Sequence, residues 1–392
     1  MKNQHADLAV VGAGILGLAH AYAAARRGLK VVVFERSLRA EGASIRNFGL
    51  IWPIGQPHGE MYQLALDSRL IWLDVLERAY LPYRPDGSLH LVYREDEARV
   101  AHEFAEIGPS LGFDCQWLGP EQVTGRTAAA KTESLLGALW SPTEVVVDPR
   151  QVIAALPEFL REVYGVEFRF GCAVHSIDLP AIEAGGERWS ADRAIVCGGA
   201  DFETLYPAHF ASSGLTRVKL QMLRTGAQPN RWHLGPALAA GLTLRFYSSF
   251  QVCSTLPALR ERIATETPEY DRWGVHGLVS QTTAGELTLG DSHEYGLAVD
   301  VFNKDEIDQL MLRWISTFLN APDMTIAERW YGVYARHPEK AYLTMEPAPG
   351  VLIVTSPGGA GMTLSFGIGE RTLSGMASPV AVRADAASEE NS

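Results

Sequence analysis

The stretch Asp7–Arg36, DLAVVGAGILGLAHAYAAARRGLKVVVFER, decides the fold. Within it, Leu8–Val11 predicts a short buried strand, Ile15–Arg27 predicts an alanine-rich helix, and Lys30–Phe34 predicts a second, β-branched strand. Together these segments form one strand–helix–strand unit at the start of the chain. The sequence therefore predicts a parallel sheet that begins with a glycine-rich turn.

Three glycines follow the first strand in the spacing of a dinucleotide-binding turn. Gly12 permits the tight turn, Gly14 lets the backbone approach a pyrophosphate, and Gly17 lets the helix pack closely on the strand. The helix N-terminus then offers N–H groups and partial positive charge to phosphates. Glu35 ends the second strand, where an acid accepts hydrogen bonds from the adenosine ribose. Since a carboxylate there would repel a 2′-phosphate, the pattern favours NAD or FAD over NADP.

Two further segments favour FAD over NAD, because in FAD enzymes later parts of the chain return to hold the flavin. The loop GASIRNFGL, residues 42–50, is polar and flanked by glycine, which suits a pyrophosphate and the flavin edge. The segment PGGAGMTLSFGIG, residues 357–369, places glycines before a C-terminal helix. The N-terminus of that helix would stabilise negative charge on a reduced flavin.

Composition and charge exclude several classes of protein. The 392 residues suffice for two domains, and the formal net charge of −12 argues against broad binding to nucleic acid or to anionic membranes. Neither a signal peptide nor an apolar run of about 20 residues is present, so we expect a cytoplasmic protein without a membrane segment. Cys115, Cys172, Cys197 and Cys253 show no metal-ligand spacing, and the eleven histidines form no HExxH motif. The sequence therefore predicts no metal site.

Several motifs resemble the FAD-dependent D-amino-acid oxidase, glycine oxidase and sarcosine oxidase family. The resemblance covers essentially the whole chain and rests on VVGAGILGL, GASIRNFG, AIVCGGA and GGAGMTLSFGIGE. The segments RNFGLIWPIGQ, SPTEVVVDPR, VKLQMLRT, GDSHEYG and YGVYARHPEKAYLTMEPAPG look more narrowly like a subgroup associated with aminophosphonate catabolism.

The resemblance implies a set of FAD contacts along the chain. These are Gly12, Gly14, Ile15, Leu16, Gly17, Glu35, Arg36, Ser44, Arg46, Asn47, Gly49, Leu50, Val174, Gly198, Gly199, Gly359, Ala360, Gly361, Met362 and Thr363. Some sarcosine oxidases bind flavin covalently through a cysteine just before the segment that matches YARHPE. Here Gly332 occupies about that place and no cysteine is near, so we expect non-covalent FAD.

We expect an α/β fold with two domains. Residues 1–86, 146–215 and 345–380 would form a Rossmann-type, glutathione-reductase-like FAD-binding domain. Residues 87–145 and 216–344 would form a substrate domain with a mixed, largely antiparallel sheet, and residues 381–392 a flexible tail. The substrate-domain strands are predicted at RVKLQML, LTLRFYSS, VHGLVSQ, ELTLGDS and IAERWYGVYAR.

Arg336 is the expected anchor for the anionic group of the substrate. It ends the strand RWYGVYAR, where the family places its substrate arginine, although the spacing differs from the GLRP form of glycine oxidases. A guanidinium binds a carboxylate or a phosphonate with two parallel hydrogen bonds. The alternative is an arginine that pairs with a surface acid such as Glu339.

A phosphonate carries up to two negative charges and favours a second cation. Lys219 and Gln221 share one face of the strand RVKLQML with Arg217, and that face either lines the cavity or is solvated. If it lines the cavity, Lys219 would aid O2 reduction or bind a phosphonate oxygen. Further substrate contacts are expected on predicted strands, strand ends and the flavin loop, each with a structural alternative: Arg245, Tyr247, His276, His293 and Trp52.

The predicted function is an FAD-dependent amine oxidase that cleaves the C–N bond of an aminophosphonate such as 2-aminoethylphosphonate, with or without an N-methyl group. The amine would give its α-hydrogen as hydride to flavin N5, the imine would hydrolyse to an aldehyde plus amine or ammonia, and O2 would be reduced to H2O2. The partners are then a small anionic amine and O2, and the oligomeric state stays open. The alternatives are a glycine, sarcosine or D-amino-acid oxidase, a flavin dehydrogenase with a different acceptor, and a non-catalytic nucleotide-binding module.

Overall fold

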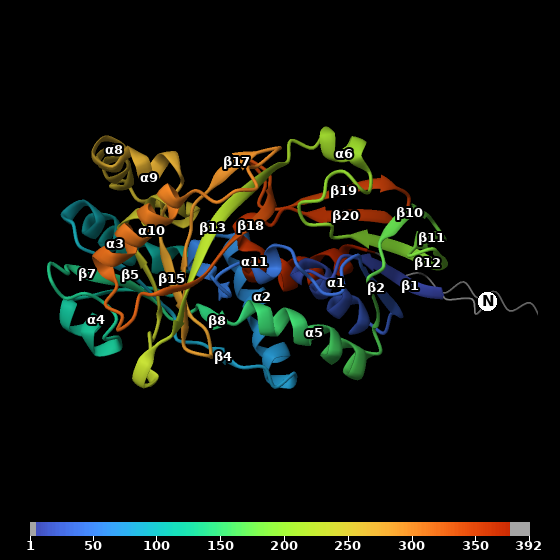
Figure 1. Cartoon of the computed structure of the whole chain (residues 1–392), viewed down its shortest axis with the longest axis horizontal. Coiled ribbons are helices and arrows are strands. Elements are labelled where there is room, and N and C mark those ends of the chain that lie inside the picture. Colours follow the sequence, from blue (N-terminus) through green and yellow to red (C-terminus); the bar gives the residue numbers. More distant parts are fainter. Residues whose placement is uncertain (1–4, 377–392) are drawn as a thin grey trace, which may run out of the picture.

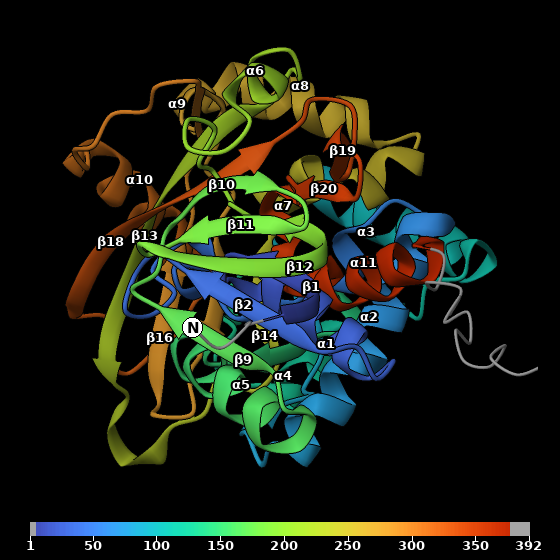
Figure 2. The same ribbon diagram turned by 90° about the vertical axis from the view of Figure 1, so that its right-hand side faces the viewer.

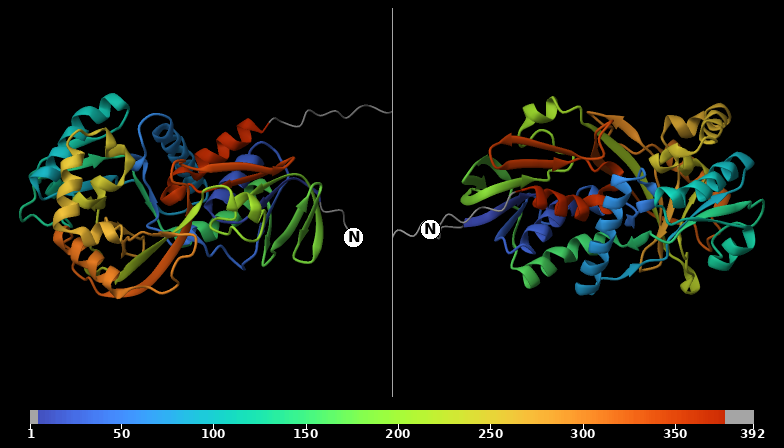
Figure 3. Two further views of the ribbon diagram at one scale, coloured as in Figure 1. Left: turned by 90° about the horizontal axis from the view of Figure 1, so that it is seen from above. Right: turned by 180° about the vertical axis from the view of Figure 1, so that it is seen from behind.

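A computed structural model describes residues 5–376 of the chain, and it contains two large β-sheets that are each covered by helices (Figure 1). The tail expected at residues 381–392 lies outside the described residues. Seen from above, the N-terminal and C-terminal elements lie together at one end, and the strands of residues 216–336 lie toward the other (Figure 3, left). The chain thus leaves the first sheet and returns to it, as the late glycine segment predicts.

The first sheet has eight strands around a parallel centre. In order they are β10 (Val174–Asp178), β11 (Ala181–Ala184), β12 (Glu187–Val196), β1 (His5–Val11), β2 (Val31–Glu35) and β9 (Glu167–Phe170), with β20 (Val351–Thr355) beside β12 and β19 (Leu343–Ala348) beside β20. β1 pairs in parallel with β2 and β12, which brings the glycine turn after β1 to the carboxyl edge of the sheet. This edge is where open α/β sheets bind ligands.

Helices α1 (Ile15–Ala25), α2 (Glu60–Arg78), α5 (Pro149–Tyr164) and α11 (Gly361–Gly375) accompany this sheet (Figure 2). α1 is buried along its whole length, and α11 packs between α1 and α2. The contact between α1 and α11 is close, because a Cβ at Gly369 would lie 2.8 Å from the carbonyl oxygen of Ala19. The last helix is therefore fixed against the first one.

The second sheet has nine strands and is largely antiparallel. In order they are β17 (Glu294–Gly296), β13 (Thr216–Ala227), β16 (Glu286–Gly290), β15 (Leu278–Gln281), β14 (Ala237–Ala240), β5 (Ser88–Val92), β7 (Gly137–Ser141) and β6 (Gln116–Leu118), with β18 (Ile326–Arg336) along β13. Only the pair β14–β5 is parallel among these strands. The ladder between β13 and β18 runs from Thr216 opposite Arg336 to Thr225 opposite Ile326, so it fixes the position of Arg336.

The remaining elements cover the second sheet or join the two parts. The helices are α3 (Glu95–Ile107), α4 (Pro120–Arg126), α6 (Pro207–Ala211), α7 (Gly241–Phe246), α8 (Leu256–Glu266), α9 (Pro268–Arg272) and α10 (Asp305–Phe318). A small third sheet consists of β3 (Leu50–Ile51), β8 (Val145–Val147) and β4 (Tyr83–Arg84). Among residues 5–376, no helix has both the length and the apolar character that a membrane crossing requires.

The predicted strand LTLRFYSS, residues 242–249, is wrong. This segment forms α7, followed by the 3₁₀ turn η5 (Ser248–Val252), and the nearby strand is β14 instead. The alternation of Leu242 and Leu244 suggested a strand, but Thr243 between them is buried too and its hydroxyl donates to the carbonyl oxygen of His276. A short apolar run does not distinguish a strand from a buried helix.

Candidate active site

A cavity of about 1770 Å³ is lined by residues from both large sheets. It extends from the glycine turn after β1, past the N-terminus of α11, to the ends of β18 and β16. Pockets for drug-sized ligands measure roughly 300–1,000 Å³. This cavity therefore has room for a dinucleotide and a small substrate together.

Almost all the FAD contacts expected from the sequence line this cavity, and the exceptions are Gly17 and Gly49. A Cβ at Gly17 would lie 1.9 Å from the carbonyl oxygen of Gly12, so Gly17 permits the close packing of α1 on the turn. A Cβ at Gly49 would lie 1.9 Å from the carbonyl oxygen of Val147. Both glycines therefore permit close backbone packing next to the cavity and do not line it themselves.

The end of the cavity near β1 has the features of a pyrophosphate and ribose site. Gly12 has a φ of 103°, and a Cβ there would lie 2.5 Å from the carbonyl oxygen of Cys197, so only glycine fits. Glu35 Oε2 accepts a hydrogen bond of 2.9 Å from the backbone N–H of Ala13, which holds the carboxylate beside the turn. The first turn of α1 contains no acidic residue that would repel a phosphate.

The other wall is the N-terminus of α11, which also lacks an acidic residue in its first turn. Thr363 Oγ1 accepts a hydrogen bond of 2.9 Å from the backbone N–H of Trp52. This bond joins α11 to the chain just after the loop of residues 42–50. A Cβ at Gly359 would lie 3.4 Å from the hydroxyl of Tyr334, so β18 approaches the glycine turn closely. The donor set, the cradle of glycines and the free helix N-termini fit FAD with its adenosine end at β1 and its ring at α11.

Arg336 lies at the rim of this cavity. It is exposed, it lines the cavity, and its guanidinium carbon lies 5.3 Å from the ring centre of Tyr295. Within residues 5–376 no acidic side chain forms an ion pair with Arg336, and the surface pair with Glu339 does not form. Arg336 is thus a cation that is free to bind an external anion.

Lys219 and Gln221 do not line the cavity. The apolar face of β13 does so instead, through Leu220 and Met222. Lys219 is fully buried, where its ammonium group donates to the carbonyl oxygen of Phe302 and lies 3.6 Å from Glu294 Oε1. Gln221 donates to Asp308 on α10 over 2.6 Å. Lys219 and Gln221 therefore pack against α10 and the segment before it, whereas Arg217 on the same face lines the cavity and pairs with Glu203.

Three other expected substrate contacts line the cavity, but they differ in how far other groups of the protein already occupy their polar atoms. Arg245 is engaged, because it pairs with Asp271 at 2.8 Å and donates to two backbone carbonyl groups. Tyr247 and Trp52 form an aromatic wall with ring centres 6.2 Å apart, and burial raises the pKa of Tyr247, so its hydroxyl stays protonated. Trp52 Nε1 is buried without a hydrogen-bond acceptor among the described residues, which leaves a donor for a bound ligand.

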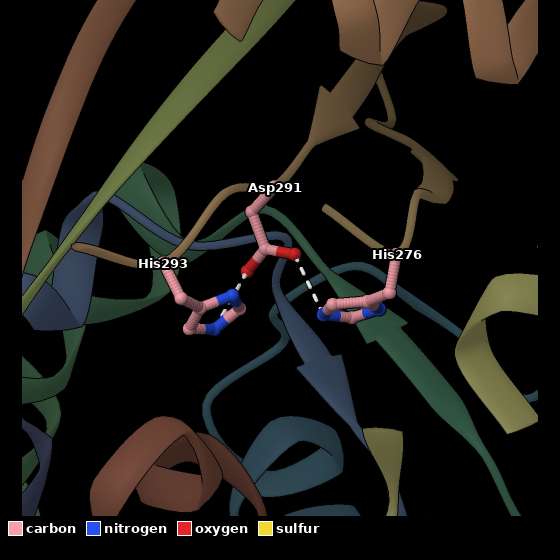
Figure 4. Close-up of side chains that lie close together, drawn as sticks. All are labelled: His276, Asp291 and His293. Atoms are coloured by element: carbon pink, nitrogen blue, oxygen red, sulfur yellow. Dashed lines mark ion pairs between the residues drawn. The ribbon is translucent and has the colours of Figure 1, made fainter. Parts of the chain in front are cut away.

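His276 and His293 meet at the same end of the cavity, on either side of a residue that the sequence analysis missed, Asp291 (Figure 4). His276 Nε2 lies 2.9 Å from Asp291 Oδ1, and His293 Nε2 lies 3.8 Å from Asp291 Oδ2. Burial lowers the pKa of His293 below its usual value. The motif GDSH was visible, but only the pairing of β15 with β16 brings His276 to it.

Buried Glu144 supports the segment that carries Trp52. Its carboxylate accepts hydrogen bonds from the N–H of Ile54 at 3.1 Å and from the hydroxyls of Ser88 and Thr143 at 2.9 and 2.8 Å. We expect Glu144→Ala to lower the free energy of unfolding by about 3 kcal/mol, because the donors of Ile54, Ser88 and Thr143 lose their acceptor. Denaturant unfolding measures this change, with the exposed Glu162→Ala as the control. Equal stability of the two variants would contradict the assignment.

Comparison with known proteins agrees with the geometry. Residues 7–374 match the family described as FAD dependent oxidoreductase. The chain is 25% identical over 165 residues to glycine oxidase from Geobacillus kaustophilus (strain HTA426), a match that covers 38% of this chain and 42% of that protein. The chain therefore aligns with less than half the length of this curated relative.

Solved structures show the same fold over nearly the whole chain. L-proline dehydrogenase from P. horikoshii superimposes with a TM-score of 0.75 at 19% identity, covering 94% of this chain and 92% of that one. Glycine oxidase from Geobacillus kaustophilus superimposes with a TM-score of 0.73 at 18% identity, covering 95% and 94%. The mixed α/β architecture with its Rossmann-type sheet is thus confirmed.

Proposed function

Because the chain belongs to the FAD dependent oxidoreductase family, we propose that it oxidises a small anionic amine at the C–N bond, with an aminophosphonate as the substrate. The observation that carries the proposal is Arg336, a cation without an acidic partner in the described chain, in the same cavity as the glycine cradle. FAD, when bound, supplies an acceptor for the electron pair of the C–H bond next to the amine nitrogen.

The chain's own residues bind, orient and enclose the substrate. Arg336 binds the anionic group by two parallel hydrogen bonds, which fixes the direction of the amine end. Trp52 and Tyr247 cover the cavity with aromatic surface and exclude water from the amine. His276 and His293 line the same end as further proposed contacts.

An anion with two charges is supported by a second free cation. Lys340 lines the cavity four residues after Arg336, and no described acidic residue pairs with it. A carboxylate needs one such cation, whereas a phosphonate dianion is better neutralised by two. This difference and the sequence resemblance favour an aminophosphonate.

FAD is proposed to bind without a covalent bond. Of the four cysteines, only Cys172 and Cys197 line the cavity. Cys197 lies beside Gly12, and the N–H of Cys172 donates to the carbonyl oxygen of Glu35, so both are at the adenosine end.

Two alternatives have observations in their favour. A glycine, sarcosine or D-amino-acid oxidase is favoured by the relative named glycine oxidase. A dehydrogenase that passes electrons to an acceptor other than O2 is favoured by the structural likeness to L-proline dehydrogenase. Formation of H2O2 under air distinguishes an oxidase from a dehydrogenase.

Anaerobic reduction of the bound flavin tests the substrate. The purified protein is mixed without O2 with 2-aminoethylphosphonate, N-methyl-2-aminoethylphosphonate, glycine, sarcosine or D-alanine, and the visible flavin band is followed. We expect an aminophosphonate to bleach the band at the lowest concentration. Bleaching by the amino acids alone would replace the proposal by the first alternative.

A further inference from the structure

The cluster of His276, Asp291 and His293 has the composition of a metal site. All three side chains are buried, with exposed fractions of 1%, 6% and 4%, and their nearest ligand atoms lie within 4.8 Å of one another. Figure 4 shows the two imidazole rings on either side of the carboxylate. The sequence analysis predicted no metal, because no local spacing pairs these residues.

The hydrogen bond behind His293 directs its lone pair into the cluster. His293 Nδ1 lies 3.0 Å from the carbonyl oxygen of Gly274, and a carbonyl group only accepts, so Nδ1 carries a proton. In the neutral ring Nε2 is then an unprotonated nitrogen, and it faces Asp291 Oδ2 across 3.8 Å. A cation between these two lone pairs would satisfy both of them. A backbone carbonyl behind the imidazole is also the common arrangement in metal sites.

Asp291 provides an independent observation. Its Oδ1 atom is buried, and its polar neighbour among the described side chains is His276 Nε2 at 2.9 Å, in a poorly aligned contact. His276 Nδ1 has no hydrogen-bond partner among residues 5–376. A metal ion between the carboxylate and the imidazole nitrogens would satisfy Asp291 better than this contact does.

We propose that His276, Asp291 and His293 bind a divalent transition-metal ion of the Zn²⁺ class in the wall of the cavity. Two imidazole groups disfavour Mg²⁺ and Ca²⁺, which prefer oxygen ligands. Bond lengths of about 2.0–2.2 Å place tetrahedral ligands about 3.3–3.6 Å apart. The distances from Asp291 to His276 and to His293, 2.9 and 3.8 Å, lie on either side of this range. Since all three residues line the cavity, the remaining coordination position faces its interior.

This position suggests what the ion binds. If the proposed function holds, the open position accepts an anionic oxygen of the substrate, and the ion supplies positive charge in addition to Arg336. The site itself does not depend on that substrate. Metal content and substrate binding are therefore measured separately.

A zinc titration tests the site. The holoenzyme is treated with EDTA, desalted and titrated with Zn²⁺ alone, and bound zinc is measured by elemental mass spectrometry while the flavin band reports the intact fold. We expect one zinc ion per chain, and affinity losses of at least about 10-fold in His293→Gln and Asp291→Asn. The exposed His175→Gln, on β10, is the matched control and should bind zinc like the wild type.

Specific results would overturn the proposal. These are a wild-type protein that binds no zinc, or His293→Gln and Asp291→Asn variants with unchanged affinity. Where a variant loses its flavin band, X-ray absorption of the zinc-loaded wild type decides, because we expect two imidazole nitrogens and a carboxylate oxygen. If zinc binds but does not lower KM for the amine that reduces the flavin, the proposed role of the ion in substrate binding is wrong, whereas the metal site itself is confirmed. A protein that no amine reduces would defeat the proposed function, and the titration would still decide the metal site.

Discussion

Arg336→Met is expected to raise KM for the anionic amine substrate by about 10- to 100-fold, because a hydrogen-bonded charge pair contributes about 1.5–3 kcal/mol. Arg336 has no acidic partner among the described residues, so its loss leaves no buried acid unpaired and the fold should persist. Steady-state kinetics measure the effect. Arg336→Lys should lie between the wild type and the methionine variant, because lysine keeps the charge and loses the planar fork.

Two controls separate anion binding from general damage. Arg99→Met removes an exposed arginine outside the cavity and should leave KM unchanged. An amine of similar size without an anionic group should be a poor substrate for the wild type, and Arg336→Met should not weaken it further. An equal increase in KM for both amines would show that Arg336 acts on the structure and not on the anion.

Gly12→Ala is expected to produce a protein that holds little FAD. The φ of 103° costs an alanine about 1–2 kcal/mol, and its Cβ would meet the carbonyl oxygen of Cys197 at 2.5 Å. Relieving that contact moves the turn where the pyrophosphate binds, so we expect FAD affinity to fall at least about 10-fold. The ratio of visible to ultraviolet absorbance of the purified protein measures occupancy.

Gly112→Ala is the matched control for this substitution. Gly112 also has a positive φ, 94°, but a Cβ there meets no atom of the described residues within 4 Å, and the residue lies outside the cavity. An alanine at position 112 therefore has the same kind of backbone strain as one at position 12, but it makes no steric contact and lies away from the cofactor site. A Gly112→Ala variant that loses FAD to the same extent would mean that strain alone explains the loss.

Local sequence signals predicted the elements that have clear boundaries. The helix Pro149–Tyr164 carries such boundary signals, because Asp148 caps its N-terminus by accepting from the N–H of Arg150, and Gly165 ends it with a φ of 69°. The strand Ile326–Arg336 was also predicted with its observed bounds. The glycine turn and Glu35 lie within one strand–helix–strand unit, so their proximity needs no long-range contact.

Features that depend on distant pairing were not predictable. The alternation in β13 separated Lys219 from Leu220, but it did not indicate that α10 would cover the polar face. Asp291 and His276 become neighbours only through the β15–β16 ladder. Helix α3 was not predicted either, although the acidic residues Glu95–Glu97 form its first turn and suit a helix N-terminus.

The most direct test of the account is a structure of the protein with bound FAD and an unreactive aminophosphonate analogue. We predict that the FAD adenosine lies beside Gly12 and Glu35, that the flavin ring lies against Gly359–Thr363, and that Arg336 contacts the phosphonate oxygens in the same cavity. An analogue bound elsewhere, with Arg336 pointing away from the flavin ring, would contradict the central claim that one cavity holds both the cofactor and an anionic amine.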